Sequence, residues 1–412
     1  MHDAVVIGAG HNGLVAANVL ADAGWSVLVV EADDEPGGAV RSGELIEPGY
    51  VNDRFSAFYP LGAASPVFRA LELDIPFRHG PLVLAHPALD GTCAVLRRDG
   101  GDPRWARIEP AVLQAMTTPF PQLRSARAAE VIRLLRRPAD PMQSRIREGN
   151  ARHTDVRPWS PAGRFFGLVL TELGRRHGYP CVEGGAGRIA DLLVERARSR
   201  GVEIRVGERV QRVPNARHAV IAAIDVWELG RITGRPSQVA RDPATLKLDW
   251  TLDGPVPWSC EPARRSPVVH LGAERDFVLV GQYSMADPSR APVGKETVWA
   301  YSHVLLDADA IEAQIERHAP GFRALVRGRH EALLPPGRVN LGTAGLRNQL
   351  CFRPFSGRPQ TGLPNVYLGS ASAHPGGGVH GAPGWIAAQA ALRSASRRRR
   401  ARGLASFTIS ST

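Results

Sequence analysis

The first thirteen residues contain a glycine-rich turn, and an acidic residue follows at Glu31, a spacing that suits the binding of a dinucleotide. Gly8 permits a tight turn, Gly10 lets the backbone approach a pyrophosphate, and Gly13 allows a helix to pack closely on a sheet. Unpaired N–H groups at the helix start favour the phosphates. Glu31 is placed to bind the two ribose hydroxyls of an adenosine, which disfavours a 2′-phosphate.

Three short elements must position these residues. The apolar run at 4–7 predicts a strand, and apolar spacing from about 12 to 23 predicts a helix that Gly24 ends. The β-branched run at 26–30 predicts a second buried strand that ends beside Glu31. A strand, a glycine turn, a helix and a second strand, in this order, are typical of the start of a Rossmann-like domain.

A second glycine turn follows Glu31. It contains Gly37 and Gly38, and Arg41 comes three residues later. The planar guanidinium of Arg41 is suited to a phosphate or to the adenosine side of a dinucleotide. Taken alone, this pair of glycines predicts only a loop.

Near the end of the chain, residues 366–369 predict a strand, 370–378 a glycine-rich loop and 381–392 an alanine-rich helix. Together with the two N-terminal turns, this arrangement resembles flavoproteins of the amine oxidase and phytoene desaturase superfamily. The stretches 8–14 and 373–382 are most similar to its phytoene dehydrogenase-related branch. The resemblance implies FAD as the cofactor, bound in an extended pose across two domains.

The resemblance also implies which residues bind FAD. Glu31 would bind the ribose, the glycine pair at 37–38 would line the cofactor channel, and the loop 374–381 would lie against the flavin ring. Many relatives carry Asp where this chain has Ser370, and a serine can hydrogen-bond but brings no charge. The expected cofactor-binding residues are Gly8, Gly10, Gly13, Glu31, Gly37, Gly38, Arg41, Val210, Gly369, Ser370, Gly378 and Val379.

A third stretch, residues 179–192, is similar to a glycine turn of the same family that starts a helix. In the family this helix leads to a pair of strands, expected here at 202–205 and 208–213. Backbone groups of the second strand bind the adenine edge there, which gives that role to Val210. Taken alone, the glycines at 184–187 are typical of a plain helix start.

These motifs predict an α/β protein with two domains, because 412 residues exceed what one core usually organises. One is a Rossmann-like FAD-binding domain with three layers around a parallel sheet. The other is an α+β substrate domain on a mixed sheet, with strands at 245–252 and 298–304, a helix at 311–318 and helical spacing at 104–137 that suits a lid. The FAD-binding domain is expected at 1–61, 180–224 and 341–392, the substrate domain at 62–179 and 225–340, and a basic, flexible tail at 393–412.

The chain is expected to lack internal segments that relatives carry. Relatives place a β-hairpin before the strand expected at 218–223, where this chain has only residues 214–217. The regions after Ser144 and before 342–345 are also expected to be short. Lost hairpins are tolerated at a surface, whereas lost lid helices would open the substrate pocket.

The net charge of +11 comes with an arginine bias, since lysine occurs only at Lys247 and Lys295. Six arginines lie at 393–402, in a solvated helix end or a disordered arm. No nucleic-acid partner is expected, and anionic lipid is favoured over it, which leaves peripheral membrane contact open.

The remaining composition narrows the class of protein. No run of about 18 apolar residues predicts a membrane span, and the strand that begins at Ala4 leaves no room for a cleavable leader, so a cytoplasmic protein is expected. The four cysteines include no C-x-x-C pair, and no His/Cys/Asp cluster has metal spacing. Neither disulfide-exchange chemistry nor a metal is therefore expected.

The resemblance implies a flavin whose N5 takes a hydride from a substrate carbon, while the protein orients the substrate and excludes water. Without a second nucleotide-binding fingerprint, the expected electron acceptor is a quinone, oxygen or a carrier protein. The candidate residues beside the ring are His374, His380, Trp385, Tyr59 and Arg54. A structural role is the alternative for each: a loop hydrogen bond for the histidines, packing for Trp385 and loop bracing for the other two. No general base is assigned.

Three functions stay open at this point. The first is an FAD-dependent dehydrogenase or desaturase acting on an apolar, carotenoid- or isoprenoid-like substrate, as the resemblance implies. The second is an amine-oxidase-like enzyme, which would need an aromatic cage for a neutral amine from a chain with 6% aromatic residues. The third is a flavin-binding or flavin-free protein with a regulatory or scaffolding role and with reduced or no catalysis. The oligomeric state is not predicted.

Overall fold

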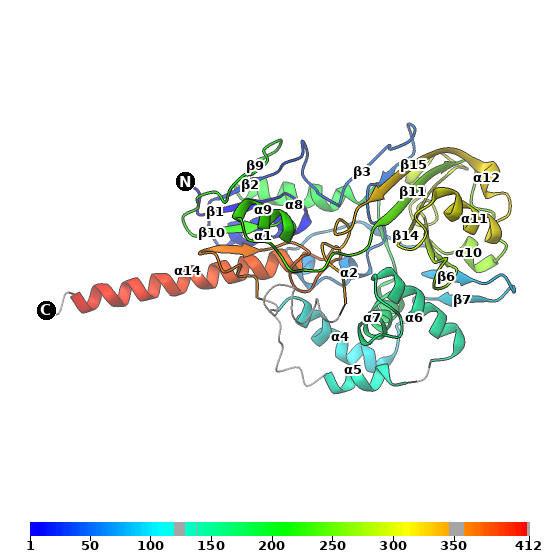
Figure 1. Ribbon diagram of the computed structural model, residues 1–412, viewed down its shortest axis with the longest axis horizontal. Helices are drawn as coiled ribbons and strands as arrows, with labels where there is room; N and C mark the ends of the chain where they lie inside the picture. The colour runs from blue at the N-terminus through cyan, green and yellow to red at the C-terminus, as the bar shows by residue number, and fades with distance from the viewer. Residues whose placement is uncertain (119–127, 138, 346–357, 410–412) are drawn as a thin grey trace.

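The computed structural model describes residues 1–118, 128–137, 139–345 and 358–409, with the side chains beyond residue 400 left aside. Two sheets, each with its own apolar core, make up the body, and one helix projects from it (Figure 1). The α/β class and the pairing of a parallel with a mixed sheet are as the sequence predicts.

The first sheet is parallel throughout, in the order β16-β10-β1-β2-β9. Its strands are short runs of mostly apolar residues, as expected when both faces of a sheet are covered. They span Ala4–Ile7 (β1), Val27–Val30 (β2), Glu203–Arg205 (β9), Ala219–Ala222 (β10) and Val366–Leu368 (β16).

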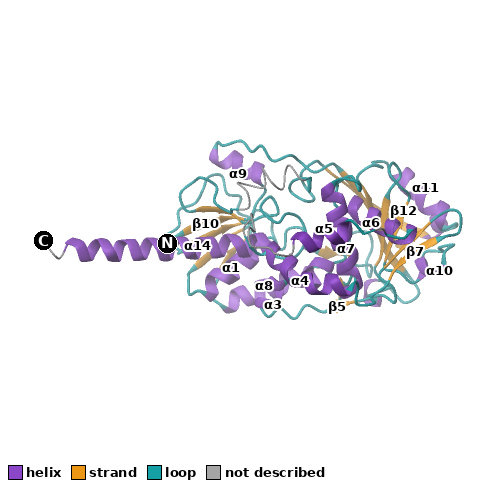
Figure 2. Ribbon diagram, turned by 90° about the horizontal axis from the view of Figure 1, so that it is seen from below, coloured by secondary structure: helices purple, strands orange, loops and turns teal. Residues whose placement is uncertain are grey.

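Three helices cover one face of this sheet: α1 (His11–Asp22), α8 (Gly187–Ser199) and α14 (Ala382–Ile409). Figure 2 shows them together on one side of the strands. The opposite face packs against α9 (Val226–Thr233) and against side chains of the crossover 206–218. Helices, sheet and crossover therefore make the expected three layers.

The crossover contains the one expected strand of this domain that does not form. Residues 208–213 are irregular, although the preceding strand is present as β9. The N–H groups of Gly207 and Glu208 donate to the carbonyls of Asp33 and Glu31 at 2.7 and 2.8 Å. These bonds turn the chain toward the end of β2 and away from the open edge of β9, so the segment has no strand to pair with.

The second sheet is mixed and has the order β15-β11-β14-β13-β12-β6-β7, with only β12 and β6 parallel. Its strands span Leu84–Pro87 (β6), Cys93–Leu96 (β7), Thr245–Leu252 (β11), Val268–Leu271 (β12), Val278–Gln282 (β13), Glu296–Ser302 (β14) and Val326–Leu334 (β15). β11 has the predicted bounds, and β14 begins two residues earlier than predicted.

The two faces of this sheet differ in chemistry. On β11, Leu246, Leu248, Trp250 and Leu252 enter an apolar core beneath α10 (Glu261–Arg264), α11 (Ala308–His318) and α12 (Phe322–Leu325). The alternate residues Thr245, Lys247, Asp249 and Thr251 therefore belong to the other face. Tyr301 and Trp299 share that face, because they pair across the ladder with Lys247 and Asp249. We call it the substrate face, because this sheet lies in the part of the chain that the sequence predicts to be the substrate domain.

A helical layer lies beside the substrate domain sheet. It contains α4 (Pro103–Met116), α5 (Ala128–Leu135), α6 (Pro141–His153) and α7 (Pro161–His177). The helices expected in 104–137 are thus present as α4 and α5, and part of that range, 119–127, lies outside the described residues. Shorter elements near the first sheet are β3 (Ser42–Gly43), β4 (Asn52–Asp53), α2 (Pro60–Ala63), α3 (Pro66–Ala70), β5 (Phe77–Arg78) and β8 (Cys181–Val182).

The helix expected at 381–392 continues well beyond that range, because α14 runs to Ile409 through the arginines of 393–402. Of the two interpretations of this segment, the structure describes the helix end (Figure 1). None of the helices in the described ranges is both long and apolar enough to cross a membrane.

Candidate flavin site and substrate face

The glycine turn between β1 and α1 has the geometry that a pyrophosphate site needs. Gly8 has a φ of +96°, and a Cβ on Gly13 would lie 2.0 Å from the carbonyl oxygen of Gly8. A Cβ on Gly10 would meet nothing nearer than 3.9 Å, so this position leaves open space beside the backbone. Two glycines thus shape the turn and the third keeps room for a ligand.

Glu31 lies directly after β2 and faces this turn. One carboxylate oxygen accepts the N–H of Ala9 at 2.6 Å, and the other accepts the N–H of Asp33 at 3.0 Å. The side chain is buried. These two bonds fix the carboxylate at the carboxyl edge of the sheet, where remaining lone pairs are free to accept ribose hydroxyls.

The second glycine turn lies on the first. Gly37 donates its N–H to the Ala9 carbonyl at 2.9 Å, and a Cβ on Gly38 would lie 3.0 Å from the Cα of Gly10. Arg41 donates to the Gly38 carbonyl and to the Asp33 carboxylate at 3.0 and 2.8 Å. The guanidinium is therefore held beside the turn, partly neutralised by an acid.

Two polar side chains of α1 were not singled out from the sequence. The Nε2 of His11 and the Oδ1 of Asn12 are buried and have no hydrogen-bond partner among the described residues. Burial lowers the pKa of His11 to about 4, in spite of a hydrogen bond to the Gly378 backbone, so the ring is neutral. Buried polar atoms normally find a partner. Two that lack one, beside the open position at Gly10, fit a bound dinucleotide.

The first turns of α1 and α14 meet in direct backbone contact. A Cβ on Gly384 would lie 1.9 Å from the Asn12 carbonyl oxygen, and one on Gly369 would lie 2.8 Å from the Ile221 side chain. Two helix N-termini, each the positive end of a dipole, therefore converge at one edge of the sheet. This arrangement suits a doubly charged pyrophosphate and a reduced flavin.

The loop before α14 is shaped by its own backbone bonds. The buried Ser370 accepts the N–H of Ser372 with its hydroxyl and the N–H of Ala373 with its carbonyl, at 3.3 and 2.9 Å. Gly378 has a φ of +119°, and the Val379 carbonyl lies close to α2, where a Cβ on Gly62 would be 3.0 Å away. Ser370 therefore acts here as a turn residue.

The candidate catalytic residues mostly make structural bonds. His380 accepts the N–H of Ala382 with Nδ1 at 3.1 Å, at the start of α14. The ring of His374 contacts the Ala115 carbonyl of α4 at 3.0 Å. The hydroxyl of Tyr59 donates to Ser56, and Trp385 packs against the core under the first sheet.

Two further predicted residues differ in their distance from the turns. Arg54 lies beside the second turn, because it donates its backbone N–H to the Arg41 carbonyl at 2.9 Å and pairs with Glu35 at 3.2 Å, and its side chain is exposed. Val210 is partly buried against the core of α9, inside the crossover that forms no strand. Its contact with an adenine stays a prediction.

A fully buried arginine links β4 to the segment that follows β13. Arg290 pairs with Asp53 at 3.1 Å and with Asp287 at 3.0 Å, and its guanidinium lies 4.6 Å from the centre of the Tyr283 ring. Asp53 also accepts the hydroxyl of Ser42 at 2.6 Å, one residue after Arg41. This cluster, which the sequence did not reveal, fixes the cofactor turns against the substrate domain.

The substrate face combines an aromatic row with a charged pair. The row contains Phe58, Tyr283, Trp299 and Tyr301, and the rings of Trp299 and Tyr301 are parallel with centroids 5.7 Å apart. Beside it, Lys247 forms a buried ion pair with Asp249. Asp249 also accepts the side-chain N–H of Asn52, the neighbour of Asp53, at 3.3 Å.

Two histidines extend this row. The ring of His153, at the end of α6, is hydrogen-bonded to the Tyr301 hydroxyl, and His303 is bonded to the Thr245 hydroxyl at 2.8 Å. His153 keeps exposed surface, yet surrounding protein lowers its pKa to about 4 by desolvation.

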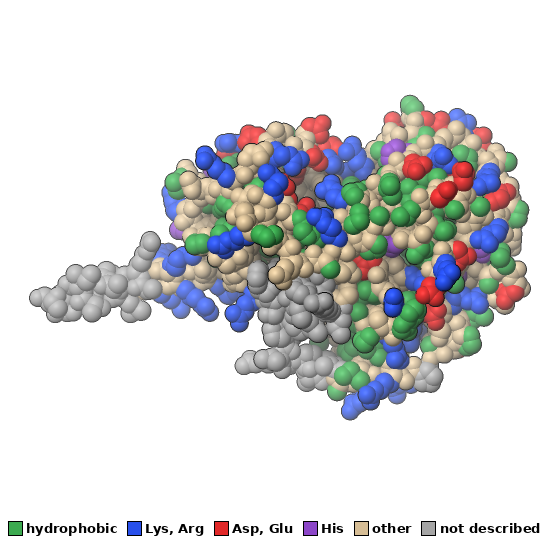
Figure 3. All heavy atoms as spheres, viewed as in Figure 1, with side chains coloured by type: hydrophobic (Ala, Val, Ile, Leu, Met, Phe, Trp, Pro, Cys, Tyr) green, Lys and Arg blue, Asp and Glu red, His purple; other side chains and the backbone are tan. Residues whose placement is uncertain are grey.

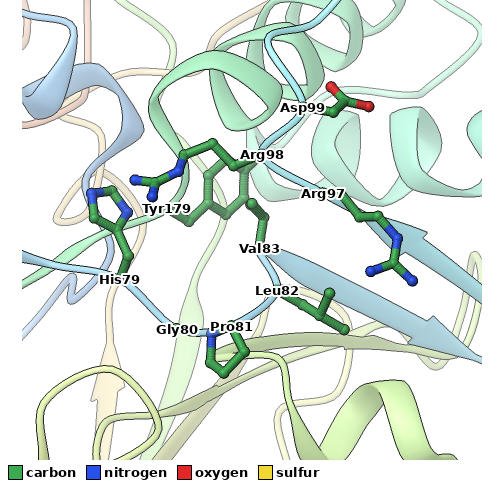
Figure 4. A pocket seen from close by; sticks show the side chains of 9 residues that line it. All are labelled: His79, Gly80, Pro81, Leu82, Val83, Arg97, Arg98, Asp99 and Tyr179. Carbon is green, nitrogen blue, oxygen red and sulfur yellow. The ribbon is translucent and has the colours of Figure 1, made fainter.

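A separate pocket of about 330 Å³ is lined by Tyr179 and by residues of 79–83 and 97–99 (Figure 4). Arg98 extends over Tyr179 toward His79, while Arg97 points away from them. Tyr179 also belongs to the apolar cluster that contains Tyr283 and Trp299. The pocket shares no residue with the predicted cofactor site.

Known proteins are similar to this chain in sequence and in fold. A family model described as an NAD(P)-binding Rossmann-like domain matches residues 6–72. The rat protein named pyridine nucleotide-disulfide oxidoreductase domain-containing protein 2 is 24% identical and covers 95% of this chain and 93% of its own. That alignment runs over 545 positions, more than the 412 residues here, so the rat protein carries segments that this chain lacks. A component of the limonene dehydrogenase of Castellaniella defragrans is 36% identical over 98 residues, 24% of this chain and 16% of its own.

Among solved structures, the cyclohexylamine oxidase of Brevibacterium oxydans aligns with a TM-score of 0.62 at 16% identity, over 97% of this chain and 99% of its own. The likeness covers both sheets and therefore concerns the whole arrangement. Together with the two glycine turns, these findings support FAD as the cofactor, as the sequence predicts. The chain shares its fold with this cyclohexylamine oxidase over nearly its whole length.

Proposed function

We propose that this protein is an FAD-dependent dehydrogenase or desaturase that acts on a carbon of a largely apolar, isoprenoid-like substrate with a polar end. The observation that carries the proposal is the substrate face, where an aromatic row ends at hydrogen-bonding groups. The similarity to a limonene dehydrogenase component, which bears the name of a terpene-oxidising enzyme, supports the isoprenoid class.

Each group of the face has a place in such a reaction. Bound FAD supplies a hydride acceptor at its N5. Phe58, Trp299 and Tyr301 bury the apolar body of the substrate and exclude water. The neutral ring of His153, bonded to the Tyr301 hydroxyl, is placed to accept the proton that leaves the substrate. His374, His380, Trp385 and Tyr59 then position the cofactor loop.

An amine-oxidase-like function is the second candidate, and one observation favours it. The aromatic residues, scarce in the chain as a whole, gather in one row on the substrate face. Rings in such a row also suit a neutral amine, and cyclohexylamine oxidase has the same fold. A flavin-binding regulatory protein stays the third candidate, because Ser370 brings no charge to the cofactor loop.

Anaerobic reduction of the FAD-saturated protein by a panel of substrates separates these candidates. We expect absorbance near 450 nm after loading with FAD, and its bleaching by monocyclic or acyclic terpenes. Bleaching by cyclohexylamine or other primary amines, and not by terpenes, would identify the amine oxidase. A protein that binds FAD but is bleached by neither class would leave the regulatory function.

A protein that takes up no FAD would exclude both enzyme functions and leave a flavin-free regulatory or scaffolding protein. Quinone, oxygen or a carrier protein as the acceptor, the cytoplasmic location and peripheral membrane contact stay predictions from the sequence, as does the layout of the two domains.

A further inference from the structure

The positive charge of this protein is concentrated near the end of the chain. Residues 332–412 contain ten arginines and no Asp, Glu or Lys, so they carry all but one of the eleven net charges. At the average acid content of the chain, about eight acidic residues would be expected in a stretch of this length. A codon preference explains arginine in place of lysine, but it does not explain missing acids.

Three of these arginines surround one pocket of about 370 Å³ between α14 and the loop before β16. Arg393 and Arg397 lie one helical turn apart on α14, and Arg358 faces them from the loop. The other lining residues are Pro359, Gln360, Ala390 and Ser394, none of which is charged. Figure 3 shows the basic side chains gathered along α14 where it leaves the body.

The backbone around this pocket is fixed. The Pro359 carbonyl accepts the N–H of Leu368 at 2.7 Å, and Gln360 forms a β-bridge with Tyr367 of β16. Arg398 anchors the helix by donating to the His218 carbonyl at 3.1 Å and to the Asn365 side chain. Strand, loop and helix therefore hold the pocket without help from its own three arginines.

Arg358, Arg393 and Arg397 differ from Arg398 in their partners. No carboxylate of the described residues forms an ion pair with any of the three, and all three are exposed. Like charges one helical turn apart repel each other. Guanidinium groups bind phosphate oxygens in a planar, two-pronged geometry, and a phosphate would relieve this repulsion.

We propose that Arg358, Arg393 and Arg397 form a phosphate-binding pocket, separate from the FAD site, for the phosphate group of a small molecule or of a lipid headgroup. The pocket volume lies in the range of small-ligand sites. Arg393 lies eleven residues beyond the start of α14, about 16 Å along the helix axis from the convergent helix N-termini.

The test uses the full chain saturated with FAD, so that phosphate cannot occupy the flavin site. Inorganic phosphate is titrated by calorimetry in chloride buffer of constant ionic strength. The double variant Arg393→Gln/Arg397→Gln is compared with Arg399→Gln/Arg400→Gln, which removes the same charge from the same helix outside the pocket. We expect at least about tenfold weaker binding, or 1.4 kcal/mol, for the pocket variant, and wild-type affinity for the control.

A second variant, Arg358→Gln, removes the contribution of the loop and leaves α14 intact, so an effect of the same size supports the pocket even where the helix variant folds poorly. Flotation with phosphatidylcholine vesicles that contain phosphatidic acid distinguishes the source. Vesicle binding that is lost with the pocket variant alone assigns a lipid headgroup, and phosphate binding without vesicle binding assigns a small molecule.

Three results would overturn the proposal. These are equal weakening by the pocket and control variants, no heat of binding at millimolar phosphate, and binding of a short DNA duplex that both variants weaken equally. The last result would make the segment a general basic surface for nucleic acid.

Discussion

The cofactor turns and the substrate face reach their geometry in opposite ways. The turns come from one stretch of 34 residues, 8–41, and use backbone shape: left-handed glycines, missing Cβ atoms and two backbone-bound side chains. The substrate face joins Phe58, His153, Lys247 and Trp299, and it uses side chains that meet only in the folded protein. Changes that disturb the backbone should therefore impair cofactor binding at the turns. Loss of a single side chain should impair substrate binding at the substrate face.

The largest effect is expected in the turn itself. In Gly13→Ala the new Cβ would overlap the Gly8 carbonyl, with 2.0 Å between them, so α1 must move and FAD binding should be lost. Gly43→Ala is the matched control, because a Cβ there meets nothing within 4 Å. Absorbance at about 450 nm after FAD loading and thermal unfolding measure both effects. Normal FAD affinity in Gly13→Ala would contradict the backbone account.

The next effect concerns the junction of the two regions. Arg290→Met leaves Asp53 and Asp287 buried without their cation, and losses of about 3–5 kcal/mol in the free energy of unfolding are typical of such a change. Urea unfolding measures it. Arg327→Met, which breaks an exposed pair with Glu47, should change stability little. Equal losses in both variants would mean that the buried cluster has no special role.

A pH effect is expected from the substrate domain sheet. Burial raises the pKa of Glu296, at the start of β14, to about 7. The hydrogen bonds that its carboxylate accepts from Ser284 and Thr297 lower the pKa and offset only part of this rise. The folded state then keeps a proton that the unfolded state releases, so stability should fall as pH rises from about 4.5 to 7. The full fall is about 3 kcal/mol.

Glu296→Gln should remove this fall. Urea unfolding of both proteins at several pH values between 5 and 8 measures the difference, and parallel curves would show that Glu296 is not the group responsible.

The smallest effect separates substrate binding from cofactor binding. Trp299→Ala should leave FAD affinity unchanged, since the ring contacts that the described residues make with Trp299 come from Phe58 and Tyr301 and not from residues 8–41. It should slow flavin reduction at low substrate by about tenfold, the scale of one lost buried ring contact. Leu333→Ala, on the exposed edge strand β15, serves as the control. Stopped-flow measurement of flavin reduction compares the two variants. A loss of FAD from Trp299→Ala would show that the substrate face also determines cofactor binding.

Local patterns account for what the sequence predicted well. The turns at Gly8–Gly13 and Gly37–Gly38, the strand β11 and the start of α14 follow from glycine placement and apolar periodicity within short windows. The strand expected at 208–213 was wrong because its alternation is local, whereas a strand also needs a partner, and hydrogen bonds to Glu31 and Asp33 draw this segment away.

The residues that the sequence did not reveal share another property. Arg290, His153 and Trp299 acquire their roles from partners about 150 to 240 positions away, and no spacing rule connects such distances. His11 and Asn12 lie inside the glycine turn that the sequence singled out, but their burial is a property of the fold. Their missing partners are visible only in the fold.

The contact between Asn12 and Gly384 joins the first helix of the chain to the last. The Rossmann sheet likewise receives β16 only after 365 other residues have been made. During synthesis, the N-terminal half of the flavin site is therefore made long before its second half. A chain truncated before residue 366 would carry the glycine turn without the strand, loop and helix that complete the site.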